Sequence, residues 1–342
     1  MPDMLQFSRR TFMVMPLALA ACKPGSAVLE LSGFTMGTTY TVVAIEGTTP
    51  VTEADVAAAI EGALSVVNKS MSNWQPDSEI SRFNAAQNKA PVSVSSELAE
   101  VMTTAEAVHI ASEGTFDTTM GPLIELWGFG APGAQSLPSD ADIAAAKARS
   151  GHVNTLGFSE NTLQKQQDDA QVYLAAIGKG YGADLIGRAL EGLGITDYMV
   201  EIGGDLYASG RNPSGTPWQI GIEAPNALDR GVLEVVGVSN VGLASSGDYR
   251  NYFEKNGQRY SHVIDPTTGR PITHRTASAT VIAENAMLAD AWATAMLILG
   301  HDRGLEIAEE QNLAVMFIDR DTEALDLRFK KKASSAFNAL TT

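Results

Sequence analysis

Asp290 is the carboxylate that ordinary structure explains least. It is the only charged residue in the apolar segment Ala286–Leu297, where an unpaired buried carboxylate would be costly. Thr294 follows four residues later, so on a helix the two side chains share a face. Carboxylate and hydroxyl oxygens are ligands that Mg²⁺ prefers. The spacing equally allows an Asp early in a helix that bonds backbone amides, with Thr294 as ordinary core.

His262 is the candidate base. It lies in a segment, 261–271, that resembles a strand ending in an Asp-Pro turn, and an imidazole has a pKa close to neutral pH. A single histidine of this kind is also often structural. The preceding turn, 244–252, is rich in hydrogen-bond donors suited to a phosphate or a ribose, although the same composition fits a surface hairpin.

The elements that must position these residues alternate between helices and strands. Periodicity and capping predict helices over 52–71, 96–112, 139–149 and 286–299, and a glycine-rich stretch, 175–182, opens another. We expect a turn running into a strand over 33–43, strands over 153–158 and 162–165, then further strands separated by turns up to 281. The basic, polar tail 330–342 is predicted to be loose. The pattern indicates a mixed α+β domain.

Composition removes several function classes. The 342 residues contain one cysteine, Cys22, which excludes an internal disulfide, a cysteine zinc site and a thiol nucleophile in the rest of the chain. There is no P-loop, no His-Glu-x-x-His motif and no Gly-x-Ser-x-Gly elbow, and the glycines of 178–182 miss the Gly-x-Gly-x-x-Gly spacing by one residue. The net charge of -16 argues against nucleic acid and anionic lipid as partners. It also means that a bound polyphosphate would need a metal ion to bridge like charges.

The first 22 residues have the features of an export signal. Arg9-Arg10 precedes an apolar run over 13–21 that ends in Leu-Ala-Ala-Cys22. The run is about half of the roughly 20 apolar residues that cross a bilayer. We expect a twin-arginine signal peptide with a lipidation site at Cys22, followed by a tether over 23–30. The protein would then lie on the periplasmic side of the bacterial inner membrane, or be soluble in the periplasm if the segment is only cleaved.

Several short segments, taken in order, resemble the ApbE family of FAD:protein FMN transferases. The matching segments are 35–40, 71–74, 78–84, 116–123, 126–130, 176–181, 201–205, 246–252, 261–266 and the helix of Asp290. The resemblance covers nearly all of the exported length. It implies a T-fold-like α+β core with mixed or antiparallel sheets and packed helices over 31–329. It also implies that FAD, the substrate, is held in a cleft with Mg²⁺ on its diphosphate.

The resemblance further implies a reaction and a set of residue roles. Family members release AMP and leave FMN esterified to a Thr or Ser of another protein, which suggests as acceptor a respiratory membrane subunit. His262 matches the residue that assists the acceptor hydroxyl, and Ala176, through its backbone oxygen, completes a metal site with Asp290 and Thr294. The residues expected to bind the nucleotide are Met36, Trp74, Phe116, Asp117, Thr118, Tyr173, Lys179 and His262.

Tyr173 departs from the family pattern, which usually has an Asp at this position, so nucleotide affinity or choice could differ here. Two other functions stay open. An FAD pyrophosphatase would use water in place of the protein hydroxyl and give free FMN and AMP, while a flavin-binding lipoprotein would leave FAD intact. The shared helix face of Asp290 and Thr294 favours chemistry, and Tyr173 is the feature that favours binding without turnover.

Overall fold

The computed structural model describes residues 27–47, 50–130, 137–226, 231–321 and 328–341. The predicted signal peptide, Cys22 and residues 23–26 of the predicted tether lie outside these ranges. The tether prediction is wrong for residues 28–30, which already belong to the first strand. None of the helices in the described ranges combines the length and the apolar character that a membrane crossing requires.

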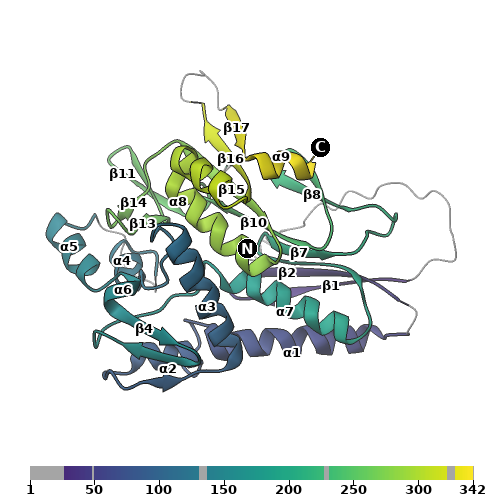
Figure 1. Ribbon diagram of the computed structural model, residues 1–342, viewed down its shortest axis with the longest axis horizontal. Helices are drawn as coiled ribbons and strands as arrows, with labels where there is room; N and C mark the ends of the chain where they lie inside the picture. Colours follow the sequence, from purple (N-terminus) through teal and green to yellow (C-terminus); the bar gives the residue numbers. More distant parts are fainter. Residues whose placement is uncertain (1–26, 48–49, 131–136, 227–230, 322–327, 342) are drawn as a thin grey trace, which may run out of the picture.

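An eight-stranded antiparallel sheet forms the centre of the molecule (Figure 1). Its strands, in spatial order, are β1 (Val28–Thr35), β2 (Thr38–Ile45), β6 (Asp197–Ile202), β7 (Asp205–Ser209), β10 (Val241–Gly247), β15 (Thr276–Ala283), β16 (Ala314–Arg320) and β17 (Phe329–Ala333). Each neighbouring pair is antiparallel. The sheet and its packed helices confirm the α+β class.

Three helices, α1 (Glu53–Met71), α7 (Gly178–Gly192) and α8 (Ala286–Glu310), pack against the sheet and one another. In Figure 1, α7 lies beside α1, and the start of α8 meets the start of α7. The α7–α8 approach depends on Gly180, because a Cβ there would lie 2.2 Å from the carbonyl oxygen of Ala286. A side chain at this position would force the two helices apart.

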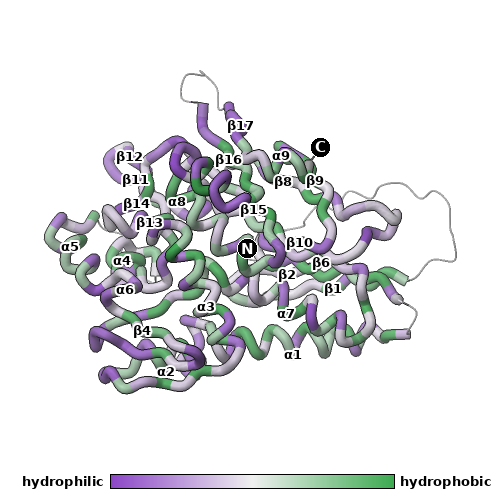
Figure 2. Tube along the Cα trace, viewed as in Figure 1, coloured by the Kyte–Doolittle hydropathy of each residue, from purple (hydrophilic) through white to green (hydrophobic). Residues whose placement is uncertain are grey.

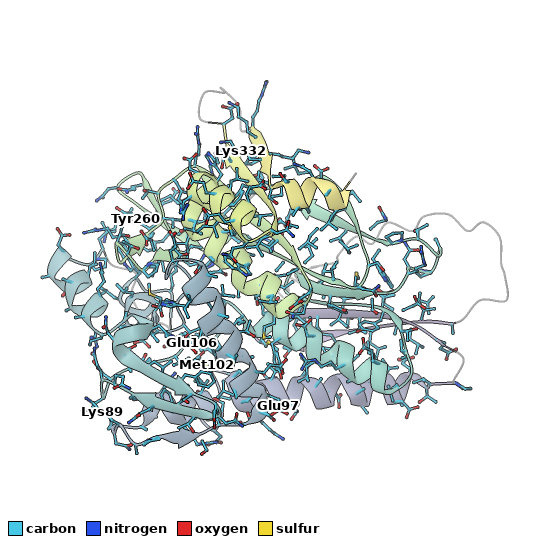
Figure 3. The ribbon with its side chains drawn as sticks, viewed as in Figure 1. Lys89, Glu97, Met102, Glu106, Tyr260 and Lys332 are labelled. Atoms are coloured by element: carbon cyan, nitrogen blue, oxygen red, sulfur yellow. The ribbon has the colours of Figure 1, made fainter. Side chains whose placement is uncertain are left out.

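The opposite face of the sheet is covered by the hairpin of β8 (Trp218–Glu223) and β9 (Val232–Val238) and by the terminal helix α9 (Ser335–Thr341). The prediction of a loose tail over 330–342 is therefore wrong. Residues 330–333 pair with β16, and Phe337 is 3% exposed in a core cluster with residues of the sheet. Basic residues on β17 hid this, because the side chain of Lys332, labelled in Figure 3, is exposed although its backbone pairs with Phe317 of β16.

A second group of elements packs beside α3 (Ser96–Ala111), at the lower left of Figure 1. It contains α2 (Glu79–Ala85), β3 (Val92–Ser93), α4 (Gly121–Leu126), α5 (Asp140–Ala148), α6 (His152–Thr155), β4 (Leu156–Ser159) and β5 (Thr162–Lys165). The strand predicted over 153–158 is corrected, because residues 152–155 form a helical turn whose backbone starts at Gly151 with φ +101. Small hairpins follow, β11 (Tyr252–Lys255) with β12 (Gln258–Ser261) and β13 (Ile264–Asp265) with β14 (Arg270–Pro271).

Helix α8 extends further than the prediction of 286–299. It is interrupted at Gly300, which has φ +69, and continues to Glu310. A cavity of about 300 Å³ beside this break is lined by His274, Arg275 and His301 among others, and contains none of the predicted site residues. In Figure 2, hydrophobic colour follows the inner helices and strands, while the hairpin β11–β12 and the outer end of β16–β17 are largely hydrophilic.

Phe337→Ala should lower the free energy of unfolding by about 3–5 kcal/mol, because it removes a large side chain from a packed cluster. Leu340→Ala, in the same helix but 55% exposed, is the matched control and should change stability little. Urea unfolding of both variants measures the difference. Equal and small effects would show that the terminal helix does not belong to the core.

Candidate functional site

The first turn of α7 and the second turn of α8 bring Lys179 and Asp290 together. Asp290 is 3% exposed, and its Oδ2 accepts a hydrogen bond from the backbone N–H of Gly180 at 3.0 Å. Its Oδ1 lies 3.6 Å from Lys179 Nζ, which also forms an ion pair with Asp205. Asp290 therefore does bond a backbone amide, but the amide belongs to another helix.

The site carries more negative than positive charge. Burial and the neighbouring Asp205 raise the pKa of Asp290 to about 7. Burial also raises the pKa of Glu201, which accepts from the backbone N–H of Gly204. Burial lowers the pKa of Lys179, but Asp205 and Asp290 outweigh it and the net shift is upward. Three carboxylates beside one ammonium would be stabilised by a divalent cation.

The predicted metal ligands supply oxygen donors of the kind that a hard cation takes. Thr294 Oγ1 lies one turn beyond Asp290 and 3.1 Å from Ser246 Oγ, and Ala176 lies in the turn just before α7. The described residues contain no group of three or more His, Cys, Asp or Glu able to hold a metal. The predicted set is of a different kind, with one carboxylate, one hydroxyl and one backbone carbonyl, and it fits Mg²⁺ with water and phosphate as further ligands.

His262 is held as a neutral imidazole with one free nitrogen. Its Nδ1 lies 3.1 Å from the carbonyl oxygen of Asn251, which can only accept, so Nδ1 carries the proton and Nε2 is left as an acceptor. Burial lowers the pKa of His262, and Lys179 lowers it further, while the Asn251 bond and Asp248 oppose the shift.

The predicted nucleotide contacts Trp74, Thr118 and Tyr173 are brought together by two asparagines. Asn73 and Asn84 both donate to the carbonyl oxygen of Val172, at 2.7 and 2.9 Å. The next residue, Tyr173, donates its N–H to the carbonyl oxygen of Thr118 at 2.7 Å. Trp74 is 66% exposed beside this junction. An aromatic surface of this kind can stack on a ring of a nucleotide.

Phe116 and Asp117 face inward. The Phe116 ring is 2% exposed within the core, so a nucleotide would meet its backbone and not its ring. Asp117 accepts from the N–H and hydroxyl of Thr119, at 2.7 and 2.6 Å, and from the N–H of His152 at 3.1 Å. These bonds give Asp117 the task of shaping the loop.

Met36 lies at the tip of the β1–β2 hairpin, above α7. A Cβ at Gly182 would come within 2.8 Å of Met36 Cε, and one at Gly203 would contact both Thr38 and the Lys179 stem. The hairpin tip, α7 and the 203–205 turn therefore meet around Lys179. Two buried hydroxyls beside the predicted contacts, Thr35 Oγ1 and Thr118 Oγ1, have no hydrogen-bond partner within the described part of the chain. Such atoms fit a site that a polar ligand completes.

The chain is similar to proteins of one family over most of its length. The sequence profile of the ApbE family matches residues 36–317. The chain belongs to the ApbE family. It is 43% identical to the FAD:protein FMN transferase of Haemophilus influenzae, covering 96% of this chain and 95% of the relative, and 41% identical to that of Vibrio cholerae, covering 94% and 95%.

Solved structures of ApbE proteins also match. The flavin transferase ApbE from Vibrio cholerae superposes with a TM-score of 0.84 at 39% identity, over 92% of this chain and 99% of that one. The flavinyl transferase ApbE of Pseudomonas stutzeri, in its apo form, gives 0.84 at 35% identity over 93% and 98%. The fold and family predictions are confirmed.

Tyr173, the departure from the ApbE pattern, is fixed at both ends. Its hydroxyl donates to Glu125 Oε1 at 2.5 Å, and its ring packs on Gly121, where a Cβ would come within 2.5 Å of it. Burial and the Glu125 bond raise the pKa of the phenol. Tyr173 therefore presents the edge of a neutral phenol where the pattern has a carboxylate.

Asp205 and Glu201 were missed as site residues by the sequence reasoning. They lie in the segment 201–205, which matches the family. The pattern of that segment predicts only a glycine turn between two strands. Asp205, at the start of β7, is 2% exposed and pairs with Lys179 of α7. A lysine that is withdrawn from solvent near a nucleotide needs a carboxylate partner. In the sequence, the only indication of Asp205 in this role was its position directly after Gly203 and Gly204.

Protonation of His152 should destabilise the Asp117 loop. Burial, and next His109 with its ring centroid 5.0 Å away, lower the pKa of His152 below its usual 6.5. The unfolded chain then binds the proton at higher pH than the folded one, so stability is lost as the pH falls below about 6.5. His152→Gln should flatten the drop in Tm between about pH 7.5 and 5.5, followed by differential scanning fluorimetry. An unchanged pH dependence would contradict this role.

Proposed function

We propose that this chain is a flavin transferase that splits the diphosphate of FAD and attaches FMN, through its phosphate, to a Thr or Ser hydroxyl of another protein. The observation that carries the proposal is the cluster of Lys179 with the buried carboxylates Asp205 and Asp290. The printed names of the relatives, FAD:protein FMN transferase, describe the same reaction. AMP is the product released.

Mg²⁺, held by Asp290, Thr294 and the carbonyl of Ala176, would neutralise the diphosphate oxygens as charge develops on the leaving AMP. The protein's own groups do the rest. Lys179, whose side chain is 30% exposed, contributes a positive charge to the phosphate region. Trp74 and the Thr118–Tyr173 junction orient the nucleotide. Positioning is the main demand of phosphoryl transfer.

His262 would take the proton of the acceptor hydroxyl on Nε2 as the oxygen–phosphorus bond forms and the bond to AMP breaks. Its Nδ1–H bond to Asn251 fixes the ring orientation and the tautomer that this step needs. The lowered pKa of His262 keeps the imidazole unprotonated near neutral pH. A group with this geometry can serve a protein hydroxyl or water.

Incubation of the protein with FAD, Mg²⁺ and a candidate acceptor tests the proposal. Transfer leaves flavin fluorescence on the acceptor in a denaturing gel, with AMP released in equal amount. Free FMN with AMP would identify a pyrophosphatase, and intact FAD would identify a binding protein. Flavin labelling of a membrane extract, followed by peptide identification, would find the acceptor itself.

We also propose that the reaction takes place outside the cytoplasm, at a membrane surface. The support is the order of Arg9-Arg10, the apolar run and Cys22 in the sequence. An anchor at Cys22 would keep the site close to membrane redox subunits that carry the acceptor residue. Metabolic labelling with a fatty acid, compared between wild type and Cys22→Ser, tests the anchor.

Asp290→Asn should reduce metal-dependent AMP release by about 100-fold or more, because metal stabilisation of phosphoryl transfer is worth several kcal/mol. Asparagine can still accept the Gly180 N–H bond, so the fold is retained. The matched pair on the same helix face is Thr294→Val, which removes an oxygen ligand, and Thr294→Ser, which keeps it. Normal turnover in Asp290→Asn, or equal effects of the two Thr294 variants, would exclude this metal site.

His262→Ala should slow flavin transfer by about 100-fold while changing FAD affinity far less, because general-base catalysis contributes about 10²–10⁴-fold to rate. Single-turnover transfer and a separate FAD binding titration measure the two effects. An equal loss in both would show that His262 contributes to binding alone.

A further inference from the structure

The two helices that carry the site exchange hydrogen bonds in both directions. Asp290, on α8, accepts from the N–H of Gly180 on α7 at 3.0 Å. Asp184, on α7, accepts from the N–H groups of Ala286 and Met287 on α8, both at 2.8 Å. Each helix therefore contributes one carboxylate that binds the first turn of the other.

Asp184 is not needed as an ordinary cap for α8. The N-cap Asn285 already accepts from the N–H of Leu288 through its side chain at 2.8 Å. Asp184 satisfies the two preceding donors, Ala286 and Met287, from a neighbouring helix. These hydrogen bonds therefore join two helices that are distant in the sequence, since Asp184 and Ala286 are 102 positions apart.

Asp184 is buried, so its carboxylate is desolvated in making these hydrogen bonds. The residue is 6% exposed, and burial raises its pKa to about 6, against the two amide bonds that lower it. It is therefore ionised at neutral pH, and hydrogen bonds from amides to an ionised carboxylate at a helix N-terminus are strong. The two helices approach so closely here that a Cβ at Gly180 would lie 2.2 Å from the carbonyl oxygen of Ala286 and 2.8 Å from the backbone nitrogen of Met287.

We propose that Asp184 is a positioning residue that fixes α8 against α7, and so sets the place of Asp290 relative to Lys179. This inference rests on the function proposed above, because the position of Asp290 affects the rate only if the site cleaves FAD. Asp184 lies one turn after Gly180 on α7. The bond from Gly180 to Asp290 and the bonds from α8 to Asp184 therefore join the same two helix starts. A displacement of about 1 Å at a reacting centre can cost 100-fold in rate.

The test compares Asp184→Ala with Asn285→Ala. Both remove capping of α8, but Asn285→Ala leaves the link between the helices intact. We expect Asp184→Ala to reduce the kcat of FAD cleavage by about 10–100-fold with FAD affinity changed less than about threefold. Asn285→Ala should lower Tm comparably and leave kcat within about threefold. Asp184→Asn, which keeps one acceptor oxygen, should recover part of the loss.

A readout that does not depend on turnover is hydrogen exchange of the Gly180 amide, measured on isotope-labelled protein without nucleotide. Loss of the hydrogen bonds from α8 to Asp184 should speed exchange of the Gly180 amide at least tenfold in Asp184→Ala. The same exchange should be unchanged in Asn285→Ala. Equal kcat or equal Gly180 exchange in the two variants would overturn the proposal. If the wild type cleaves no FAD, the function proposed above fails, and the exchange comparison still decides the role of Asp184.

Discussion

The hydrogen bond from the Gly180 amide to Asp290 is the contact on which the site depends. It is possible because Gly180 has no side chain and because Asp184 holds the start of α8 in return. A buried carboxylate without such partners would be unstable or neutral. The α7–α8 contact thus keeps a carboxylate ready for a cation at the point where two helices, a hairpin tip and a glycine turn converge.

The sequence predicts the elements that rely on periodicity and capping. Helix 52–71 is found as α1, with Thr52 and Asp55 forming a capping box, and the helix of Asp290 begins where expected. The tail was mispredicted because its strand consists mostly of lysines, whose exposed side chains hide a paired backbone, and because Phe337 is the one large apolar residue that the last helix buries in the core. Pairing of an edge strand depends on its neighbour in space, and local composition does not contain that information.

The sequence predicted which residues belong to the candidate site better than it predicted where their side chains lie. Lys179 and Asp290, 111 positions apart in the sequence, lie 3.6 Å apart as ion partners. Phe116 and Asp117 illustrate the limit. A motif indicates that a loop is important without showing which atoms face the ligand, and here the Asp117 carboxylate is engaged by Thr119 and His152. Asp205 and Asp184 were not assigned roles because their partners are set by the packing of the sheet and helices.

Charge explains why such a site would use a metal instead of more lysines. The chain carries a net charge of -16, and Asp205, Asp290 and Glu201 surround the single ammonium of Lys179. A diphosphate added to this environment alone would meet repulsion that burial strengthens. A divalent cation reverses the sign of the local field, so nucleotide and cation should bind with positive coupling, each raising the affinity of the other by the same factor. The excess of carboxylates is in that case the feature that ties FAD binding to the metal.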